Sequence, residues 1–193
     1  MPAKYGAITK AYIENDAQLR NLAGDRLPNN NSMNLYVLSY DANRNFVACN
    51  DAIKENLRNY LKEYRLLTDA INIRDPFIID ISVDVDIIPY ADENSNEVIL
   101  RCLDVMIDYF DPDKISINQP IIISNLRSAL DRVSGVMTVV NIDFGCIIGT
   151  GYSNNWYDLE VAERNGIIYP PQTISIFQVR NRLRDLRCRV VEG

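Results

Sequence analysis

The stretch PFIIDISVDVDIIPY, which runs from Pro76 to Tyr90, decides the fold because apolar and polar residues alternate along it. The odd positions from 77 to 87 are all apolar, whereas even positions carry Asp80, Ser82, Asp84 and Asp86. Alternation with a period of two is typical of a β-strand that buries one face. The stretch therefore predicts a strand with one side packed on a core and the other side facing solvent.

The acidic row of Asp80, Asp84 and Asp86 has two interpretations: a metal or acid/base site, or the solvated face of the strand. Side chains two residues apart on a strand are separated by roughly 6.6 Å, so at most two neighbouring carboxylates can touch one ion. A calcium ion prefers about six to eight oxygen ligands, which a straight row does not supply. We therefore predict a solvated face, with a charged surface for a protein partner as the functional alternative.

Capping and turn signals place the other elements around this strand. We expect the following ranges to be strands, the first two antiparallel to each other: Tyr5–Ile13, Asn34–Tyr40 and Val136–Phe144. We expect helices that start at Asn50 or Asp51, that run from Ser95 to Phe110, and that run from just after Pro120 to Gly135. This order of elements predicts an α+β fold, in which about three helices cover one face of a small mixed sheet.

The last part of the chain differs in character from the rest. After Phe144 the sequence is rich in turn residues, contains Pro170–Pro171 and has no amphipathic period. We therefore predict an α+β core domain over residues 1–144 and an irregular C-terminal arm over residues 145–193. The arm is expected to end in a short strand near Leu186 to Val191, and to pack less densely than the core, on that core or on a neighbouring subunit.

The composition excludes several classes of chemistry. The chain of 193 residues contains no histidine, which removes Ser-His-Asp and Cys-His nucleophile systems and His-containing zinc sites. Its cysteines form no CxxC pair, so we expect buried free thiols at Cys49, Cys102, Cys146 and Cys188. The net charge of -6 argues against a nucleic-acid partner. No apolar run has the roughly 20 residues of a membrane span, and the start lacks a signal-peptide pattern, which predicts an intracellular origin.

Two short motifs have both a functional and a structural interpretation. GTGY, Gly149 to Tyr152, is not followed by a helix pattern or a Lys-Ser/Thr pair, so it predicts a turn and not a phosphate site. RNRLRDLRCR, Arg180 to Arg189, holds five arginines. Because the chain as a whole is acidic, we interpret them as a contact with an acidic protein surface, with a nucleic-acid patch and a solvated surface as alternatives.

A set of sequence segments that together cover nearly the whole chain resembles one protein family. The segments are KYGAITKAYIEND, NLYVLSYD, IKENLRNYLKEYRLLTDAINIRDPFIIDISVDVDI, VILRCLDVMIDYFD, LRSALDRVSGV and GIIYPP. Together they are similar to the C-terminal part of the baseplate wedge protein of contractile-tailed bacteriophages, within the wider baseplate J-like family. They are specific as a set: a helix leads through YRLLTD to the alternating strand, and two helices then end in Ser134-Gly135-Val136.

This resemblance implies a structural role and not an enzyme. Family members are ring-forming scaffold proteins that join wedge subunits around the tail hub and transmit the baseplate rearrangement to the sheath. The resemblance implies a homo-oligomer, other baseplate wedge proteins as partners, and a place in the virion after assembly in the host bacterial cytoplasm. It implies no catalytic, cofactor-binding or metal-binding residue. The family's N-terminal portion is absent here, so the chain resembles a C-terminal fragment.

A small carboxylate-dependent enzyme or metal-binding domain is the alternative from a different class. It would use the row of Asp80, Asp84 and Asp86, or the pair Asp104 and Asp108, which lie four residues apart on the second expected helix. A concave pocket that holds two or more of these carboxylates would favour the enzyme. A large self-complementary apolar patch would favour the scaffold.

Overall fold

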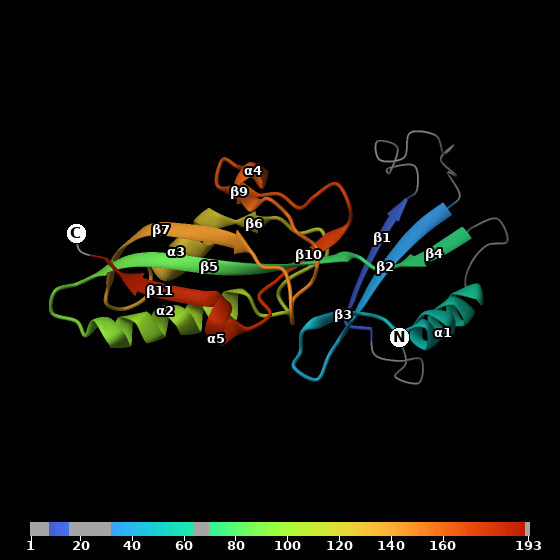
Figure 1. Ribbon diagram of the computed structural model, residues 1–193, viewed down its shortest axis with the longest axis horizontal. Coiled ribbons are helices and arrows are strands. Elements are labelled where there is room, and N and C mark those ends of the chain that lie inside the picture. Colours follow the sequence, from blue (N-terminus) through green and yellow to red (C-terminus); the bar gives the residue numbers. More distant parts are fainter. Residues whose placement is uncertain (1–7, 16–31, 64–69, 192–193) are drawn as a thin grey trace. The chain divides into compact units, whose positions relative to one another are not determined.

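A computed structural model of the chain describes residues 8–15, 32–63 and 70–191, and it has the predicted α+β class (Figure 1). The chain forms two compact units. Unit 1 contains residues 1–77 and 172–174, and unit 2 contains residues 78–171 and 175–193. The boundary between the units therefore differs from the one expected at residue 144.

Unit 1 is built on β2 (Ser32–Tyr40), the central strand of a four-stranded sheet. Strands β1 (Lys10–Asn15) and β3 (Phe46–Ala48) pair with β2 antiparallel, and β4 (Ala70–Arg74) pairs with it parallel. The predicted antiparallel pair of strands is confirmed, although residues 5–7 of the expected first strand lie outside the described residues. The short strands β3 and β4 were not predicted.

Helix α1 (Asp51–Lys62) begins where its cap predicts. The Asn50 side chain accepts a hydrogen bond from the Ile53 backbone N–H at 2.8 Å, so Asn50, and not Asp51, is the N-cap residue. Leu57 of this helix packs with Leu35 and Val37 of β2 in a small apolar core. One buried stripe of the helix thus covers one face of the unit 1 sheet.

Unit 2 is built on β5 (Phe77–Pro89), the predicted alternating strand. Strand β7 (Val136–Cys146) pairs with β5 antiparallel along one edge, and β11 (Leu186–Val190) pairs with it parallel along the other. In this register, Val83 lies opposite Phe144 on one side and Leu186 on the other. Strand β10 (Ser175–Gln178) belongs to the same sheet. A smaller sheet contains β6 (Ile121–Ile122), β9 (Ile167–Ile168) and β8 (Glu163–Arg164).

The apolar side of β5 forms the centre of the unit 2 core. Five of its residues are at most 2% exposed: Ile79, Ile81, Val83, Val85 and Ile87. They pack against α2 (Ser95–Tyr109) and α3 (Ile123–Leu130), which contribute Cys102, Met106, Leu126 and Leu130 to the same core. The predicted face is therefore the buried one, except that Phe77 is 47% exposed.

Helix α3 differs in extent from the prediction. Helix α3 begins at Ile123 and not just after Pro120, because Ile121 and Ile122 pair with β9 before the helix starts. It ends at Leu130, several residues before Gly135. Gly135 has a φ of 95° and Val98 lies close to it, so this position requires glycine at the turn into β7.

The end of the expected irregular arm packs into the unit 2 core. Strands β10 and β11 both belong to the main sheet, and Ile176, Phe177, Val179 and Leu186 are buried. Along the chain, the short helix α4 (Leu159–Ala162) lies between β7 and β10, and the short helix α5 (Arg182–Asp185) lies between β10 and β11. The expected strand near Leu186 to Val191 is confirmed, and residues 147–158 form no helix or strand, but the loose packing expected for the arm does not hold for the buried residues of β10 and β11.

Val83→Asp should destabilise unit 2 by about 3 kcal/mol or more, because it places an unpaired carboxylate in the apolar core. Val83 is 0% exposed and lies between β7 and β11. Urea unfolding followed by circular dichroism measures the loss. Met137→Asp, on the 52% exposed Met137 of β7, is the matched control and should change stability by less than about 1 kcal/mol. Equal losses in the two variants would mean that the strand register is wrong.

Candidate functional site

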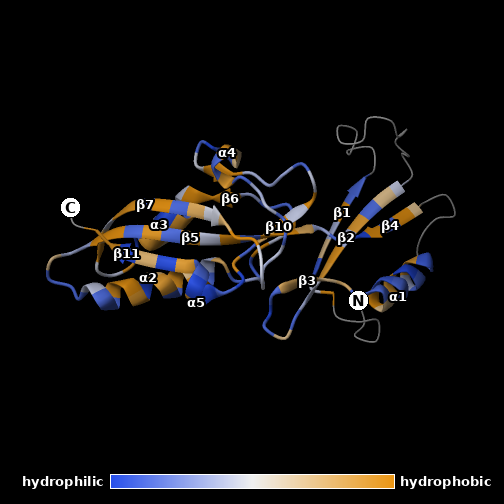
Figure 2. Cartoon of the chain, in the orientation of Figure 1, coloured by the Kyte–Doolittle hydropathy of each residue, from blue (hydrophilic) through white to orange (hydrophobic). Residues whose placement is uncertain are grey.

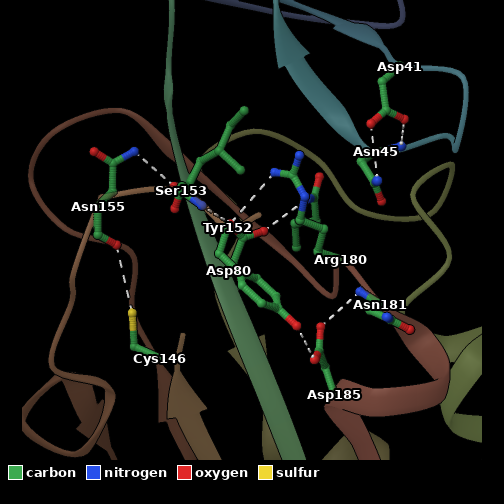
Figure 3. A network of polar contacts seen from close by, with 12 residues as sticks. Asp41, Asn45, Asp80, Cys146, Tyr152, Ser153, Asn155, Arg180, Asn181 and Asp185 are labelled. Atoms are coloured by element: carbon green, nitrogen blue, oxygen red, sulfur yellow. Dashed lines mark hydrogen bonds and ion pairs between the residues drawn. The ribbon is translucent and has the colours of Figure 1, made fainter. Parts of the chain in front are cut away.

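The most polar buried cluster of unit 2 lies where the loop after β7 crosses β5 (Figure 3). We call it the aspartate clasp and define it by six residues: Asp80, Tyr152, Ser153, Gln178, Arg180 and Asp185. Its members come from β5, from the loop after β7, from β10 and from the segment around α5. It includes one residue of the predicted acidic row, Asp80.

Asp80 is buried, although its row was predicted to face solvent. It is 0% exposed, because the loop after β7 covers this end of the strand's polar face. Its Oδ1 accepts a hydrogen bond from Gln178 Nε2 at 2.9 Å, and its Oδ2 accepts one from the Ser153 N–H at 2.5 Å. The Arg180 guanidinium lies 4.0 Å from Oδ2. These donors compensate the loss of hydration that burial imposes on the carboxylate.

Asp185 is the second buried carboxylate of the clasp and is 1% exposed. The Tyr152 hydroxyl donates to its Oδ1 at 2.7 Å, and the Asn181 N–H donates to its Oδ2 at 2.8 Å. Burial, followed by the neighbouring Asp185 carboxylate, raises the pKa of Tyr152, so the phenol keeps its proton and remains a donor. The Arg184 guanidinium lies 5.6 Å from the centre of the Tyr152 ring.

The GTGY motif shapes the loop that delivers these donors. Gly149 and Gly151 have φ values of 115° and 89°, and the Tyr152 N–H donates to the Gly149 carbonyl at 2.9 Å. Left-handed backbone at two nearby positions is accessible at low energy only to glycine. The predicted turn is confirmed, and the residues that follow it bind the protein's own carboxylates.

Three of the predicted arginines pair with the predicted acidic row inside the chain. Besides Arg180 and Asp80, Arg187 lies 3.8 Å from Asp84, and Arg189 lies 3.3 Å from Asp86. The last two pairs are direct neighbours in the parallel register of β11 and β5. Figure 2 shows the hydrophilic residues of β5, β7 and β11 side by side across the sheet. The acidic surface that these three arginines contact therefore belongs to this chain's own β5, and Arg182 lies 4.0 Å from Asp111 of the same chain.

The clasp offers no reacting group in an active arrangement. The Ser153 Oγ is buried and has no hydrogen-bond partner in the described part of the chain, so no base activates it there. Burial raises the pKa of Cys146, and the neighbouring Cys102 sulfur and burial raise the pKa of Cys188, so both stay neutral thiols. All four cysteines are free, with Cys49 and Cys102 buried and the other two half-buried. Among the described residues, no group of three potential metal ligands comes together.

A separate pocket of about 320 Å³ opens between α2 and α3. We call it the α2–α3 pocket. Its wall is mostly apolar and includes Val105, Tyr109, Phe110, Ile115, Ile121 and Phe177. Of the five carboxylates considered for an enzyme, only Asp108 lines it, and the Lys114 ammonium lies 2.6 Å from that carboxylate. The structure thus does not bring Asp104 or the acidic row to this pocket.

Sequence reasoning found Asp80 and the arginines but missed Tyr152, Ser153, Gln178 and Asp185. Ser153 and Gln178 are 73 and 98 residues away from Asp80 along the chain, so no local period connects them. The available signal was the pair of glycines in GTGY, which marks a turn that can present backbone donors. It does not indicate what those donors bind.

Asp80→Ala should destabilise unit 2 by about 3 kcal/mol, because it leaves the Ser153 N–H and the Gln178 amide buried without an acceptor. Asp80→Asn restores one acceptor oxygen and should lose about half as much. Chemical denaturation measures both variants. The control is Asp104→Ala at the exposed Asp104 of α2, where the loss should stay below about 0.5 kcal/mol. If Asp80→Ala unfolds like its control, the clasp does not hold the loop.

The Asp86–Arg189 pair should show a coupling energy of about 0.5 kcal/mol in a double-mutant cycle with Asp86→Asn and Arg189→Gln. The value is small because the Arg189 side chain is 63% exposed. The coupling should shrink toward zero in about 1 M salt, since screening acts on exposed charges. The same cycle between Arg189 and the exposed Glu160 should give no coupling. A coupling above about 2 kcal/mol, or one that ignores salt, would contradict this assignment.

Comparison with known proteins adds no relative. No model of a known protein family matches the chain, and no curated protein sequence matches it. Within the described ranges, no helix has both the length and the apolar character needed to cross a bilayer.

Proposed function

We propose that the chain is a structural subunit of the tail baseplate wedge of a contractile-tailed phage, where it self-associates and contributes to the ring around the tail hub. The observation that carries the proposal is a group of large apolar side chains exposed on unit 2. Leu183 is 91% exposed, Val161 73%, Trp156 64% and Leu100 62%. They come from four separate segments of the unit, and covering side chains of this kind with a partner removes apolar surface from water.

The use of polar groups in unit 2 supports the same proposal. The buried carboxylates Asp80 and Asp185 accept hydrogen bonds from distant segments of the chain, and Asp84 and Asp86 pair with arginines of β11. These contacts hold the last strands of the chain against β5. Their chemistry is that of internal cross-links, which suits a rigid part that transmits force to its neighbours.

The family resemblance supplies the specific setting of the proposal. It suggests other baseplate wedge proteins as partners, and a virion location reached after assembly in the host bacterium. It also suggests that the subunit is not an enzyme. The internal pairing of the arginines favours protein contacts through apolar side chains, because fewer cationic groups remain for a phosphate backbone.

The purified chain should form at least a dimer at high micromolar concentration, because exposed apolar surface is removed from water on association. Light scattering behind a sizing column measures its mass at low and moderate salt. Point variants at exposed residues are the suitable controls. A truncation at Gln178 would also remove the core strand β11.

A second measurement tests whether the chain is part of a phage tail. Peptides of this chain should be found by mass spectrometry in purified tails of the phage that encodes it. A chain that is monomeric in solution and absent from tails would overturn the proposal. Salt-sensitive binding of duplex DNA would overturn it in favour of the nucleic-acid alternative.

A further inference from the structure

We propose that β1 of one copy pairs antiparallel with β1 of a second copy about a two-fold axis at Tyr12, so that two unit 1 sheets join into one. The inference rests on the proposed self-association and names one contact surface for it. A contact of this kind uses the same surface on both copies and closes a dimer. A ring needs a further contact elsewhere, for which the exposed apolar side chains of unit 2 remain available.

Strand β1 forms one edge of the unit 1 sheet (Figure 1). Among the described strands it pairs only with β2, along residues Lys10 to Asn15. Backbone N–H and C=O groups alternate in direction along a strand, so half of those in β1 point away from β2. An extended segment can therefore add to this edge through main-chain hydrogen bonds, and the side chains decide which segment fits.

The side chains of β1 are complementary to a second copy of the same strand. In an antiparallel pair, residues directly opposite each other lie on the same face of the sheet. With Tyr12 opposite Tyr12 of the second copy, Lys10 lies opposite Glu14, and Ala11 lies opposite Ile13. Each lysine thus faces a carboxylate, each isoleucine faces a small residue, and the two tyrosines face each other.

Glu14 has a carboxylate oxygen that this pairing would satisfy. Its Oε2 is buried and has no hydrogen-bond partner in the described part of the chain. Burial raises the pKa of Glu14, because it removes water from the carboxylate. Side chains directly opposite each other have Cβ atoms about 5 Å apart, so the Lys10 ammonium of the second copy reaches Glu14. An ammonium has three donors and can serve Glu14 in addition to the contact that Lys10 makes in its own chain.

Ile13 gains an apolar neighbour in the same register. It is 63% exposed, the highest value for a large apolar side chain in the described part of unit 1. A recess of about 240 Å³ next to β1 is lined by residues that include Ala11, Leu35, Val37 and Leu57. Ala11 and Ile13 lie opposite Val37 and Leu35 in the sheet, so all four share the face on which the recess opens. Ile13 of the second copy would lie next to the small Ala11, at the rim of this recess.

Strand β4, which is also an edge strand, does not have this complementarity. A self-pairing centred on Asn72 would place Arg74 opposite Ala70, which offers no acid to the arginine. The Arg74 Nε already donates to Asn34 Oδ1 at 3.1 Å within unit 1. Charge and size therefore select β1 as the self-pairing edge.

The first experiment exchanges the charges. Glu14→Lys places lysines opposite each other and Lys10→Glu places glutamates opposite each other, so each variant alone should associate roughly tenfold more weakly than the parent in sedimentation. A mixture of the two variants has a lysine opposite a glutamate at both positions and should recover the parent's affinity within about threefold. Glu63→Lys, at the exposed end of α1, is the matched control and should change the affinity by less than about twofold.

The second experiment tests the apolar part of the contact. Ile13→Asp should weaken association roughly tenfold or more, because it places a charge next to the apolar recess. Ile13→Val, its control, keeps an apolar side chain and should stay within about threefold of the parent. Because Ile13 is exposed, both chains should melt like the parent in dilute solution.

A cross-link locates the two-fold axis and does not depend on affinity. Tyr12→Cys places two cysteines opposite each other with Cα atoms about 5 Å apart, within the range of a disulfide. Asn15→Cys, on the same strand, leaves its two cysteines roughly 20 Å apart in this register. With oxidised glutathione as the oxidant, Tyr12→Cys should form a covalent dimer, and neither Asn15→Cys nor the parent should.

The outcomes separate this contact from the proposed function. An oligomeric parent that is insensitive to Ile13→Asp and to both charge variants, and whose Tyr12→Cys variant gives no covalent dimer, would overturn the contact and leave the proposed function standing. A parent that stays monomeric at high micromolar concentration would also overturn the contact. In that case the search for the chain in purified tails decides the proposed function separately.

Discussion

The buried carboxylate of Asp80 is the constraint on which the rest of unit 2 depends. A charge on the central strand of a sheet is strongly unfavourable in the absence of water unless donors surround it. Those donors are the Ser153 N–H and the Gln178 amide, from segments 73 and 98 residues further along the chain. Asp80 thus fixes the path of the loop after β7 and the position of β10 together. The two left-handed glycines before Tyr152 follow from the same requirement, because they let the backbone reach the carboxylate.

The alternating charged residues of β5 and β11 help to fix the register in which the two strands pair. Arg187 and Arg189 lie opposite Asp84 and Asp86, while Leu186 and Cys188 lie opposite Val83 and Val85. A shift of one residue would turn both arginines toward the core and bring Leu186 to the surface. The weak ion pairs therefore contribute little to stability individually, but the shared alternation permits only one pairing of the two strands.

The sequence predicted the elements that carry their own period or cap. The alternation of residues 77–87 identified the central strand and its buried face, and Asn50 identified the start of α1. It failed where the structure comes from distant pairing: β10 is short, lacks a strong period and joins the sheet only through β5, and the parallel pairing of the predicted strand β11 with β5 was not expected. The same reason applies to the clasp, in which Asp185 and Gln178 have ordinary neighbours in the sequence. Local patterns assigned Asp80 to solvent because nothing near it in the sequence reveals the loop that covers it.

Each unit contains segments that are far apart in the sequence, and this affects how the chain folds during synthesis. Residues 172–174 belong to unit 1, whereas the first part of unit 1 ends at Phe77. In unit 2, β5 receives its parallel partner β11 only from residues 186–190, close to the end of the described chain. Unit 1 can therefore reach its final set of contacts on the ribosome only after residue 174 has emerged, and unit 2 only after residue 190. Nascent chains will expose the unpaired edge of β5 until β11 has emerged, and contacts so distant in sequence slow folding. Until β11 covers it, this open edge of β5 offers unpaired backbone groups to other strands, so the topology creates a risk of wrong pairing during synthesis.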